Sequence, residues 1–194
     1  MFYVKKAASF PVQNITDWKN KMLNWANRFN IFCFLDNQQY HHAHPTFECL
    51  LAVDAMHVIE CSAGNALSTV GTFSQAHNDW CFGHLSYDLK NEVEKGLLSE
   101  HIDGIGFTDT AFFIPATVVR LATDVIEIFS EADPKSIYEQ IEKTSPHVIP
   151  HQSPVFDIQS RFSFNEYMHA VNEIKRHIQR GDCYEVNFCQ EFYV

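Results

Sequence analysis

The sequence predicts an α+β fold, with antiparallel β-sheets and flanking helices. Two observations support this prediction. Apolar runs of strand length come in neighbouring pairs joined by short polar turns, which is typical of hairpins. Helix patterns fall between these pairs at irregular intervals, which disfavours a doubly wound parallel sheet. The 194 residues are 46% hydrophobic and include 17 Phe, so the chain has ample apolar material for a core.

The first predicted helix follows Asn14 or Thr16 as its N-cap. Its apolar residues repeat at helical spacing and form one stripe: Trp18, Met22, Trp25 and Phe29. A short apolar strand is expected at 31–35, and it ends at Asp36-Asn37.

Two further apolar runs, 47–53 and 56–61, are predicted to pair as a hairpin. The polar dipeptide Asp54-Ala55 between them is the expected turn. For residues 66–78 the pattern leaves helix and strand open.

The middle of the chain is predicted to alternate strand and helix. Residues 80–87 read as a strand, and 88–98 read as the beginning of a helix. A second hairpin is expected from 118–121 and 125–129, because the turn residues Ala122-Thr-Asp124 separate two apolar runs.

The predicted domain boundary lies near residue 155. Asp133 and Pro134 are an N-cap and a first-turn proline, so a helix is expected there. The stretch 144–156 that follows is the best candidate for a linker, because it contains Pro146, Pro150 and Pro154. We therefore expect one domain at 1–155 and the start of another at 156–194.

The last part of the chain is a helix followed by a strand pattern. Ser163 and Glu166 have the spacing of a capping box, and Gly181 lies where a left-handed residue would end the helix. Polar and apolar residues then alternate over 183–192, as in a strand with one core face. One helix and one strand cannot bury their apolar faces alone, so the chain is expected to be the first part of a longer protein.

Charge and composition exclude several classes of partner. The formal charge of −10 disfavours general nucleic-acid or anionic-membrane binding, because such partners need clustered Lys and Arg. No apolar run approaches the length of a membrane span, and the N-terminal residues do not form a secretion signal. The six cysteines show no CxxC pair, which favours free buried thiols in a reducing cytoplasm.

No catalytic or metal site is predicted from motif chemistry. The cluster His41-His42-Ala-His44 suggests metal binding at first sight, but adjacent side chains on an extended segment point to opposite sides. A polar surface loop is therefore expected there. The chain contains no GxSxG, Walker or GxGxxG pattern, and no cysteine has a local activating signature.

Two stretches of the chain resemble one enzyme family. Residues 181–192, Gly-Asp-Cys-Tyr-Glu-Val-Asn-Phe-Cys-Gln-Glu-Phe, follow a helix with Ile174-Lys175 and resemble the opening of a chorismate-binding domain. That domain is shared by the component I subunits of the anthranilate and para-aminobenzoate synthases. Residues 80–94, which contain Ser86-Tyr-Asp-Leu-Lys-Asn-Glu92, resemble a signature of the N-terminal region in the same family.

The resemblance implies which residues belong to the chorismate-domain motif: Gly181, Asp182, Tyr184, Asn187 and Gln190. Asn187 and Gln190 are more similar to the para-aminobenzoate branch. Glu185 and Glu191 depart from the glutamine and arginine of many relatives. The family's catalytic lysine, its acid and its metal ligands match positions beyond Val194, so the resemblance assigns no catalytic residue here and implies that the 194-residue chain alone is inactive.

The resemblance also implies cofactors and partners for the full-length enzyme. Chorismate would be the substrate, magnesium the cofactor, and a glutamine amidotransferase subunit the source of ammonia. No magnesium is expected to be bound by this chain. The alternatives are the anthranilate branch of the family and a non-catalytic amino-acid-binding module.

Many relatives hold a tryptophan molecule in the N-terminal region. The matching positions imply an amino-acid pocket formed by Asn37, His44, Pro45, Thr46 and Phe47. Asn37 stands where serine is usual, and both side chains can hydrogen-bond an amino acid. The residues at 44–46 carry no strong signature, so an ordinary connection into the strand from Phe47 remains the alternative.

Overall fold

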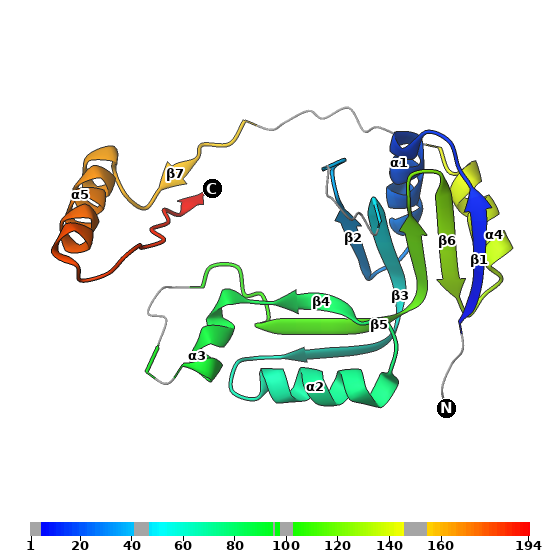
Figure 1. The fold of residues 1–194 in the computed structure, drawn as a ribbon, viewed down its shortest axis with the longest axis horizontal. Helices are drawn as coiled ribbons and strands as arrows, with labels where there is room; N and C mark the ends of the chain where they lie inside the picture. Colours follow the sequence, from blue (N-terminus) through cyan, green and yellow to red (C-terminus); the bar gives the residue numbers. More distant parts are fainter. Residues whose placement is uncertain (1–4, 41–46, 95, 98–102, 146–154) are drawn as a thin grey trace. The chain divides into compact units, whose positions relative to one another are not determined.

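The computed structural model describes residues 5–40, 47–94, 96–97, 103–145 and 155–194. The chain divides into two compact units, Met1–Val148 and Ile149–Val194. Helices and antiparallel strands are mixed within the chain, so the predicted α+β class is confirmed (Figure 1).

The first unit is built on one antiparallel sheet. Its strand order is β1-β6-β5-β3-β2, and β4 pairs with β5. The strands are β1 (Lys6–Pro11), β2 (Phe32–Asp36), β3 (Cys49–Cys61), β4 (Phe82–Leu85), β5 (Thr110–Leu121) and β6 (Val125–Ser130). The predicted hairpin of β5 and β6 is confirmed, because Leu121 pairs with Ile126 across the turn.

The predicted hairpin at Asp54-Ala55 is wrong. β3 continues through these residues and pairs with β5 on both sides of them, with a register shift between Ala55 and His57. Asp54 has a φ of 62°, a left-handed conformation that a short polar side chain tolerates. The turn-type residues thus form a β-bulge, because the long strand β5 offers a partner to both halves of β3.

Two helices cover one face of this sheet. They are α1 (Ile15–Ala26) and α4 (Pro134–Lys143), and each has the predicted N-cap: Asn14 accepts from the Asp17 N–H, and Asp133 accepts from the Ser136 N–H. The core beneath them joins both helices to β3, β5 and β6: Trp18, Met22, Trp25, Leu51, Val53, Val119, Leu121, Ile126, Ile128, Ile137 and Ile141. A second cluster contains Leu50, Ala52 and Val118 with Phe82 and Phe113.

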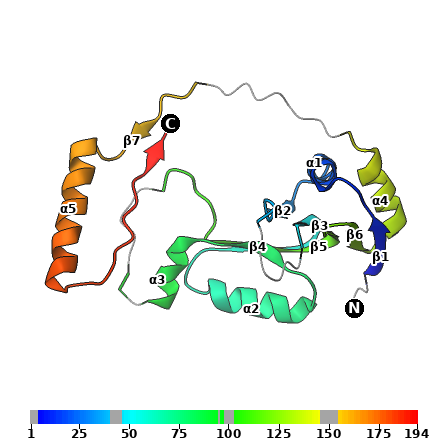
Figure 2. The same ribbon diagram turned by 45° about the horizontal axis from the view of Figure 1, so that its top comes forward.

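The ambiguous segment 66–78 is a helix, α2 (Ala66–His77), which lies against β3 and β5 (Figure 2). In the described part of 88–98, where a helix was expected, the chain forms a short 3₁₀ turn, η1 (Tyr87–Leu89), followed by α3 (Lys90–Val93). Among the described residues of this segment only Leu89 is buried, so the packing seen there does not support a longer helix.

The described part of the second unit contains α5 (Phe164–Arg180) and a two-stranded sheet of β7 (Gln159–Ser160) and β8 (Phe192–Tyr193). The capping box at Ser163 is confirmed, and Gly181 has the predicted left-handed conformation with a φ of 83°. The predicted strand over 183–192 is largely wrong, and Tyr184 is fully exposed. In the described part of this unit β7 offers only two residues for pairing, and a strand needs a hydrogen-bonded neighbour.

All six cysteines are free thiols, as predicted. They were also expected to be buried, but only Cys49 is fully buried. Cys189 is exposed, and the other four cysteines are partly buried. Burial raises the pKa of Cys49 to about 12, so this thiol stays protonated and unreactive. Among the described residues, no helix is both long and apolar enough to cross a membrane.

Candidate functional site

A polar cluster lies where α1 meets the end of β2. Its centre is the Lys19 ammonium, which donates to a carboxylate oxygen of Asp36 and to one of Glu48, both at 2.5 Å. The Lys19 side chain is 9% exposed, and those of Asp36 and Glu48 are 19% and 15% exposed. A lysine this well buried is uncommon unless it is paired, and here one cation serves two carboxylates.

The turn after β2 completes the cluster with backbone and amide groups. Gln38 and Gln39 have positive φ values of 53° and 56°, and this conformation directs the Gln38 N–H to Asp36 and the Gln39 N–H to Glu48, each at 2.8 Å. The Asn37 side chain donates to the Tyr40 carbonyl at 2.9 Å and more weakly to Glu48 at 3.4 Å. The carboxylates are therefore held by the turn as well as by the lysine.

Hydrogen bonding and charge outweigh burial in this cluster. Burial is the largest single influence on both groups, and it acts to lower the pKa of Lys19 and to raise that of Glu48. The opposing bonds to Asp36 and Glu48 nevertheless raise the pKa of Lys19 above its ordinary 10.5. The bonds from Lys19, Gln39 and Asn37 lower the pKa of Glu48 below its ordinary 4.5. These shifts keep both Lys19 and Glu48 charged at neutral pH, and the cluster sets one cation against two carboxylates.

A pocket of about 180 Å³ opens beside the cluster. It combines apolar and charged walls: Leu23 and Lys19 from α1, Phe34 and Asp36 from β2, and Gln38 and Gln39 from the turn. A cation, a carboxylate and apolar side chains in one small pocket match the groups of a zwitterionic amino acid.

The residues predicted for an amino-acid pocket are only partly near this place. Asn37 belongs to the polar cluster. Phe47 instead packs against the second core cluster, with Leu50 and Phe82. His44, Pro45 and Thr46, like the histidines at 41–42, lie outside the described residues.

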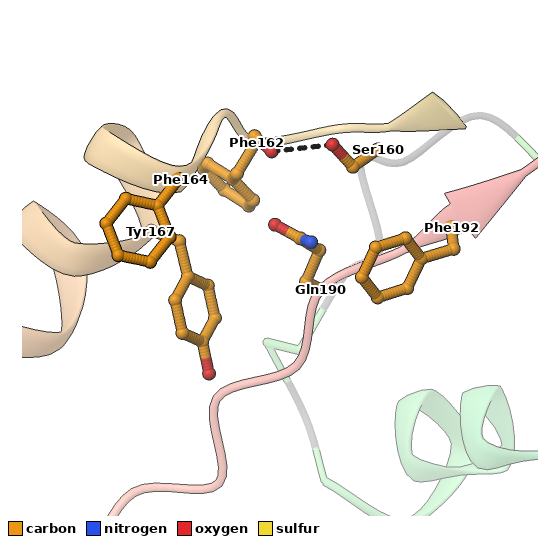
Figure 3. Close-up of a pocket in the computed structure, with 6 residues that line it drawn as sticks. All are labelled: Ser160, Phe162, Phe164, Tyr167, Gln190 and Phe192. Atoms are coloured by element: carbon orange, nitrogen blue, oxygen red, sulfur yellow. Dashed lines mark hydrogen bonds between the residues drawn. The ribbon is translucent and has the colours of Figure 1, made fainter. Parts of the chain in front are cut away.

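The second unit has an aromatic pocket of about 460 Å³ (Figure 3). Its lining residues come from β7, the turn into α5, the start of α5, the segment before β8 and β8 itself: Ser160, Phe162, Phe164, Tyr167, Gln190 and Phe192. The Gln190 side chain points into it among the rings, and its Oε1 is buried without a hydrogen-bond partner. Phe188 stacks beside it on Tyr167, with ring centroids 5.3 Å apart.

The five motif residues do not converge on this pocket. Gln190 lines it, whereas Tyr184 and Asn187 are exposed. Gly181 ends α5, and Asp182 lies in an exposed ion pair with Arg180 at 2.5 Å, with His177 Nδ1 at 2.7 Å from the same carboxylate oxygen. These bonds, chiefly the one from Arg180, lower the pKa of Asp182.

Sequence reasoning missed Lys19, although a signal for it exists. Lys19, Met22 and Ala26 are spaced i, i+3 and i+7 on the buried side of α1. A lysine among the apolar residues of a helix face indicates that an oppositely charged group lies nearby to pair with it. The partners Asp36 and Glu48 could not be chosen from spacing, because they are 17 and 29 residues away.

The described residues do not fit a metal centre. No group of three His, Cys, Asp or Glu side chains among them could hold an ion. Asp36 and Glu48 do converge, but Lys19 occupies the position between them.

Comparison with protein families defines the class of this protein. The family model for chorismate binding enzymes matches residues 26–194, from the last turn of α1 through the second unit. The chain therefore belongs to the family of chorismate binding enzymes. A search of curated proteins finds no match to it.

Proposed function

We propose that the chain is the N-terminal part of aminodeoxychorismate synthase component I, the chorismate-aminating enzyme of the para-aminobenzoate branch. The family match over residues 26–194 supports a chorismate-utilising enzyme. The residues Asn187 and Gln190, which are more similar to that branch, support the choice of member. The full-length enzyme would replace the 4-hydroxyl of chorismate with an amine, on the way to folate.

In this proposal the described residues form a structural part of the enzyme and contribute no catalytic group. Chorismate carries two carboxylates, which need cations or a metal to bind them. None of the six residues lining the aromatic pocket is Asp, Glu, His, Lys or Arg, so this pocket offers chorismate no ionic contact. We therefore propose that the 194-residue chain has no synthase activity by itself.

Magnesium and ammonia belong to the full-length enzyme in this proposal. Magnesium, when bound there, would neutralise the carboxylates of chorismate. Because the described residues do not fit a metal, no step through magnesium is assigned to them. A glutamine amidotransferase subunit would supply the ammonia, and the six free thiols support a reducing, cytoplasmic setting.

Product analysis tests the proposed branch. The full-length gene product is incubated with chorismate, ammonium and Mg²⁺, and the products are separated by chromatography. We expect 4-amino-4-deoxychorismate from the full-length protein and no product from the 194-residue chain. Formation of anthranilate would assign the protein to the other branch, and turnover by the short chain would disprove its proposed inactivity.

We further propose that the pocket beside Lys19 binds an amino acid such as tryptophan. Lys19 and the Gln38 and Gln39 side chains would face the ligand carboxylate, and Asp36 its ammonium. Leu23 and Phe34 would contact its side chain. A ligand in this place would lie beside Asn37 but away from Phe47, which packs in the other cluster.

Calorimetry with three related compounds tests this pocket. Tryptophan should bind, while tryptamine and indole-3-propionate should bind at least tenfold more weakly, because each lacks one charged group. Leu23→Arg should abolish binding by filling the pocket. Leu67→Arg on α2 is the matched control, because Leu23 and Leu67 are 40% and 42% exposed. Equal binding of all three compounds, or no binding of tryptophan, would refute the proposal.

A further inference from the structure

The first turn of α2 is held by two carboxylates from distant parts of the chain. Glu92 accepts hydrogen bonds from the backbone N–H groups of Gly64, Ala66 and Leu67, at 2.9, 2.8 and 3.0 Å. Asp109 accepts from the Ala63 N–H at 2.8 Å. Four of the five N–H groups from Ala63 to Leu67, all except that of Asn65, therefore donate to side chains that are 25–46 residues away.

The helix lacks a cap of its own. Its N-cap residue is Asn65, a type that commonly caps helices, yet the Asn65 side chain makes no capping hydrogen bond. The first turn of α2 also contains no acidic residue. Two of the N–H groups that the helix leaves free at its start, those of Ala66 and Leu67, thus bond to a carboxylate from another part of the chain. A carboxylate is the favourable group at the positive end of the helix dipole.

α2 also has little else to stabilise it. Of its twelve residues only Ala66 and Phe73 are buried, and Gly71 lies in its middle. An isolated helix of this length is marginal in water, and a central glycine weakens it further. The state of the first turn is therefore sensitive to the contacts of Glu92.

The two carboxylates that accept these hydrogen bonds, Glu92 and Asp109, both belong to the part of the chain between β4 and β5. Glu92 is in α3, which begins directly after the buried Leu89. Asp109 precedes β5, and its second carboxylate oxygen accepts from the Ser86 hydroxyl at 2.9 Å. The Ser86 N–H also donates to the Asp109 carbonyl at 2.7 Å. The end of β4, α3 and the start of β5 are joined to α2 through these two acidic residues.

We propose that Glu92 is a positioning residue that acts as a tertiary cap of α2, and that Glu92 and Asp109 form a clasp that makes α2 and the 86–93 segment order or loosen together. This role gives a physical reason for a glutamate within Tyr87-Asp-Leu-Lys-Asn-Glu92, the stretch that resembles the family signature. It is independent of the proposed aminating activity, because no substrate takes part.

The carboxylate of Glu92 is the part of the clasp that can be switched. Its hydrogen bonds with Gly64, Leu67 and Ala66 outweigh a burial effect of opposite sign and lower its pKa below the ordinary 4.5. The bonds of the Glu92 carboxylate are therefore formed above pH 4.5, and they are lost as the pH falls through the lowered pKa of Glu92. Among the described charged residues, Asp109 bonds to the Ala63 N–H beside the Gly64 N–H that Glu92 accepts from. Asp88 and Lys90, in the same stretch of chain as Glu92, pair with each other at 2.5 Å.

Amide hydrogen exchange on the 194-residue chain tests the clasp. In Glu92→Ala the amides of Gly64, Ala66 and Leu67 should exchange at least roughly fivefold faster, because they lose their acceptor. Glu92→Gln keeps the shape but only one acceptor oxygen, so an intermediate effect is expected. Glu94→Ala is the matched control, since Glu94 is an exposed glutamate just after the same segment and its loss should leave these amides unchanged.

A second readout separates the clasp from general destabilisation. The amide proton shifts of residues 64, 66 and 67 should follow one acid transition in the wild type, and this transition should vanish in Glu92→Gln. The β5 amides should exchange at the same rate in all variants. Unchanged protection at 64–67 in Glu92→Ala, an equal loss in Glu94→Ala, or a transition that persists in Glu92→Gln would overturn the proposal.

Discussion

Replacing Lys19 with methionine should destabilise the first unit well beyond the loss of an ordinary surface ion pair. The substitution keeps the length and apolar stem of the side chain but removes the ammonium that lies 2.5 Å from both Asp36 and Glu48. Two carboxylates would then face each other with no cation between them.

The expected size of the effect follows from burial. Removing one partner of a fully buried ion pair costs about 3–5 kcal/mol, whereas exposed pairs contribute about 0.2–1 kcal/mol. The carboxylates here are 19% and 15% exposed and keep the backbone donors of Gln38 and Gln39, so the cost should fall between these ranges. We expect a loss of roughly 2–3 kcal/mol, which lowers the Tm of a unit of this size by about 4–12 °C.

Urea denaturation followed by tryptophan fluorescence measures this loss. Trp18 and Trp25 are buried in the same helix and report on its packing. Lys21→Met is the matched control, because Lys21 pairs with Asp17 across one helical turn at 3.1 Å and the Asp17 side chain is 32% exposed. That control should cost less than about 1 kcal/mol.

A double-mutant cycle identifies the cause. In the Glu48→Gln background one of the two opposed charges is already gone, so Lys19→Met should cost less there, by about 1 kcal/mol or more. Equal losses for Lys19→Met and Lys21→Met, or a coupling energy near zero between Lys19 and Glu48, would refute the reasoning.

Three further predictions concern other parts of the chain. Gly83→Ala should displace β4 from β5 and lower the stability by at least about 2 kcal/mol in a thermal melt, because a Cβ there would lie 2.0 Å from the Ala111 carbonyl oxygen. At Gly71 a Cβ would meet no atom within 4 Å, so Gly71→Ala should instead stabilise α2 by about 0.5–1 kcal/mol. A stability change of the same sign for both substitutions would contradict this reasoning. Ser163→Ala should weaken the start of α5 by about 1 kcal/mol, seen as lower helicity by circular dichroism, and unchanged helicity would show that the capping box contributes nothing. Because Glu48 has a lowered pKa, its contribution to stability is present above pH 4.5 and is lost as the pH falls through the lowered value; denaturation at several pH values should therefore show a weaker acid dependence in Glu48→Gln, and identical slopes would count against it.

Much of the helical structure could be predicted from local sequence. The N-caps Asn14, Asp133 and Ser163 and the left-handed Gly181 act through atoms within a few residues of themselves, so their chemistry is visible in the chain. The helix expected at 88–98 is much shorter than predicted, and the other wrong predictions concern strands. The Asp54-Ala55 turn signal became a bulge, and the alternating pattern after Cys183 formed only a short strand, because pairing partners decide both outcomes.

The candidate site was predictable only in part. Asn37 was expected to contribute to a pocket, and it lies in a polar cluster with a pocket beside it. The central cation Lys19 was missed, and so was the role of Glu92, since each bonds to groups 17 or more residues away. Spacing along the chain carries no information about such contacts.

The sequence by itself determined the fold class, the caps of three helices and the family resemblance, because these depend on residue type and short-range order. Only the tertiary structure decided that β3 is one strand and that Lys19 serves two carboxylates. It alone also showed that α2 is capped by Glu92. The physical reason is that a strand, a buried charge and an uncapped helix each need a partner, and the fold chooses that partner from distant parts of the chain.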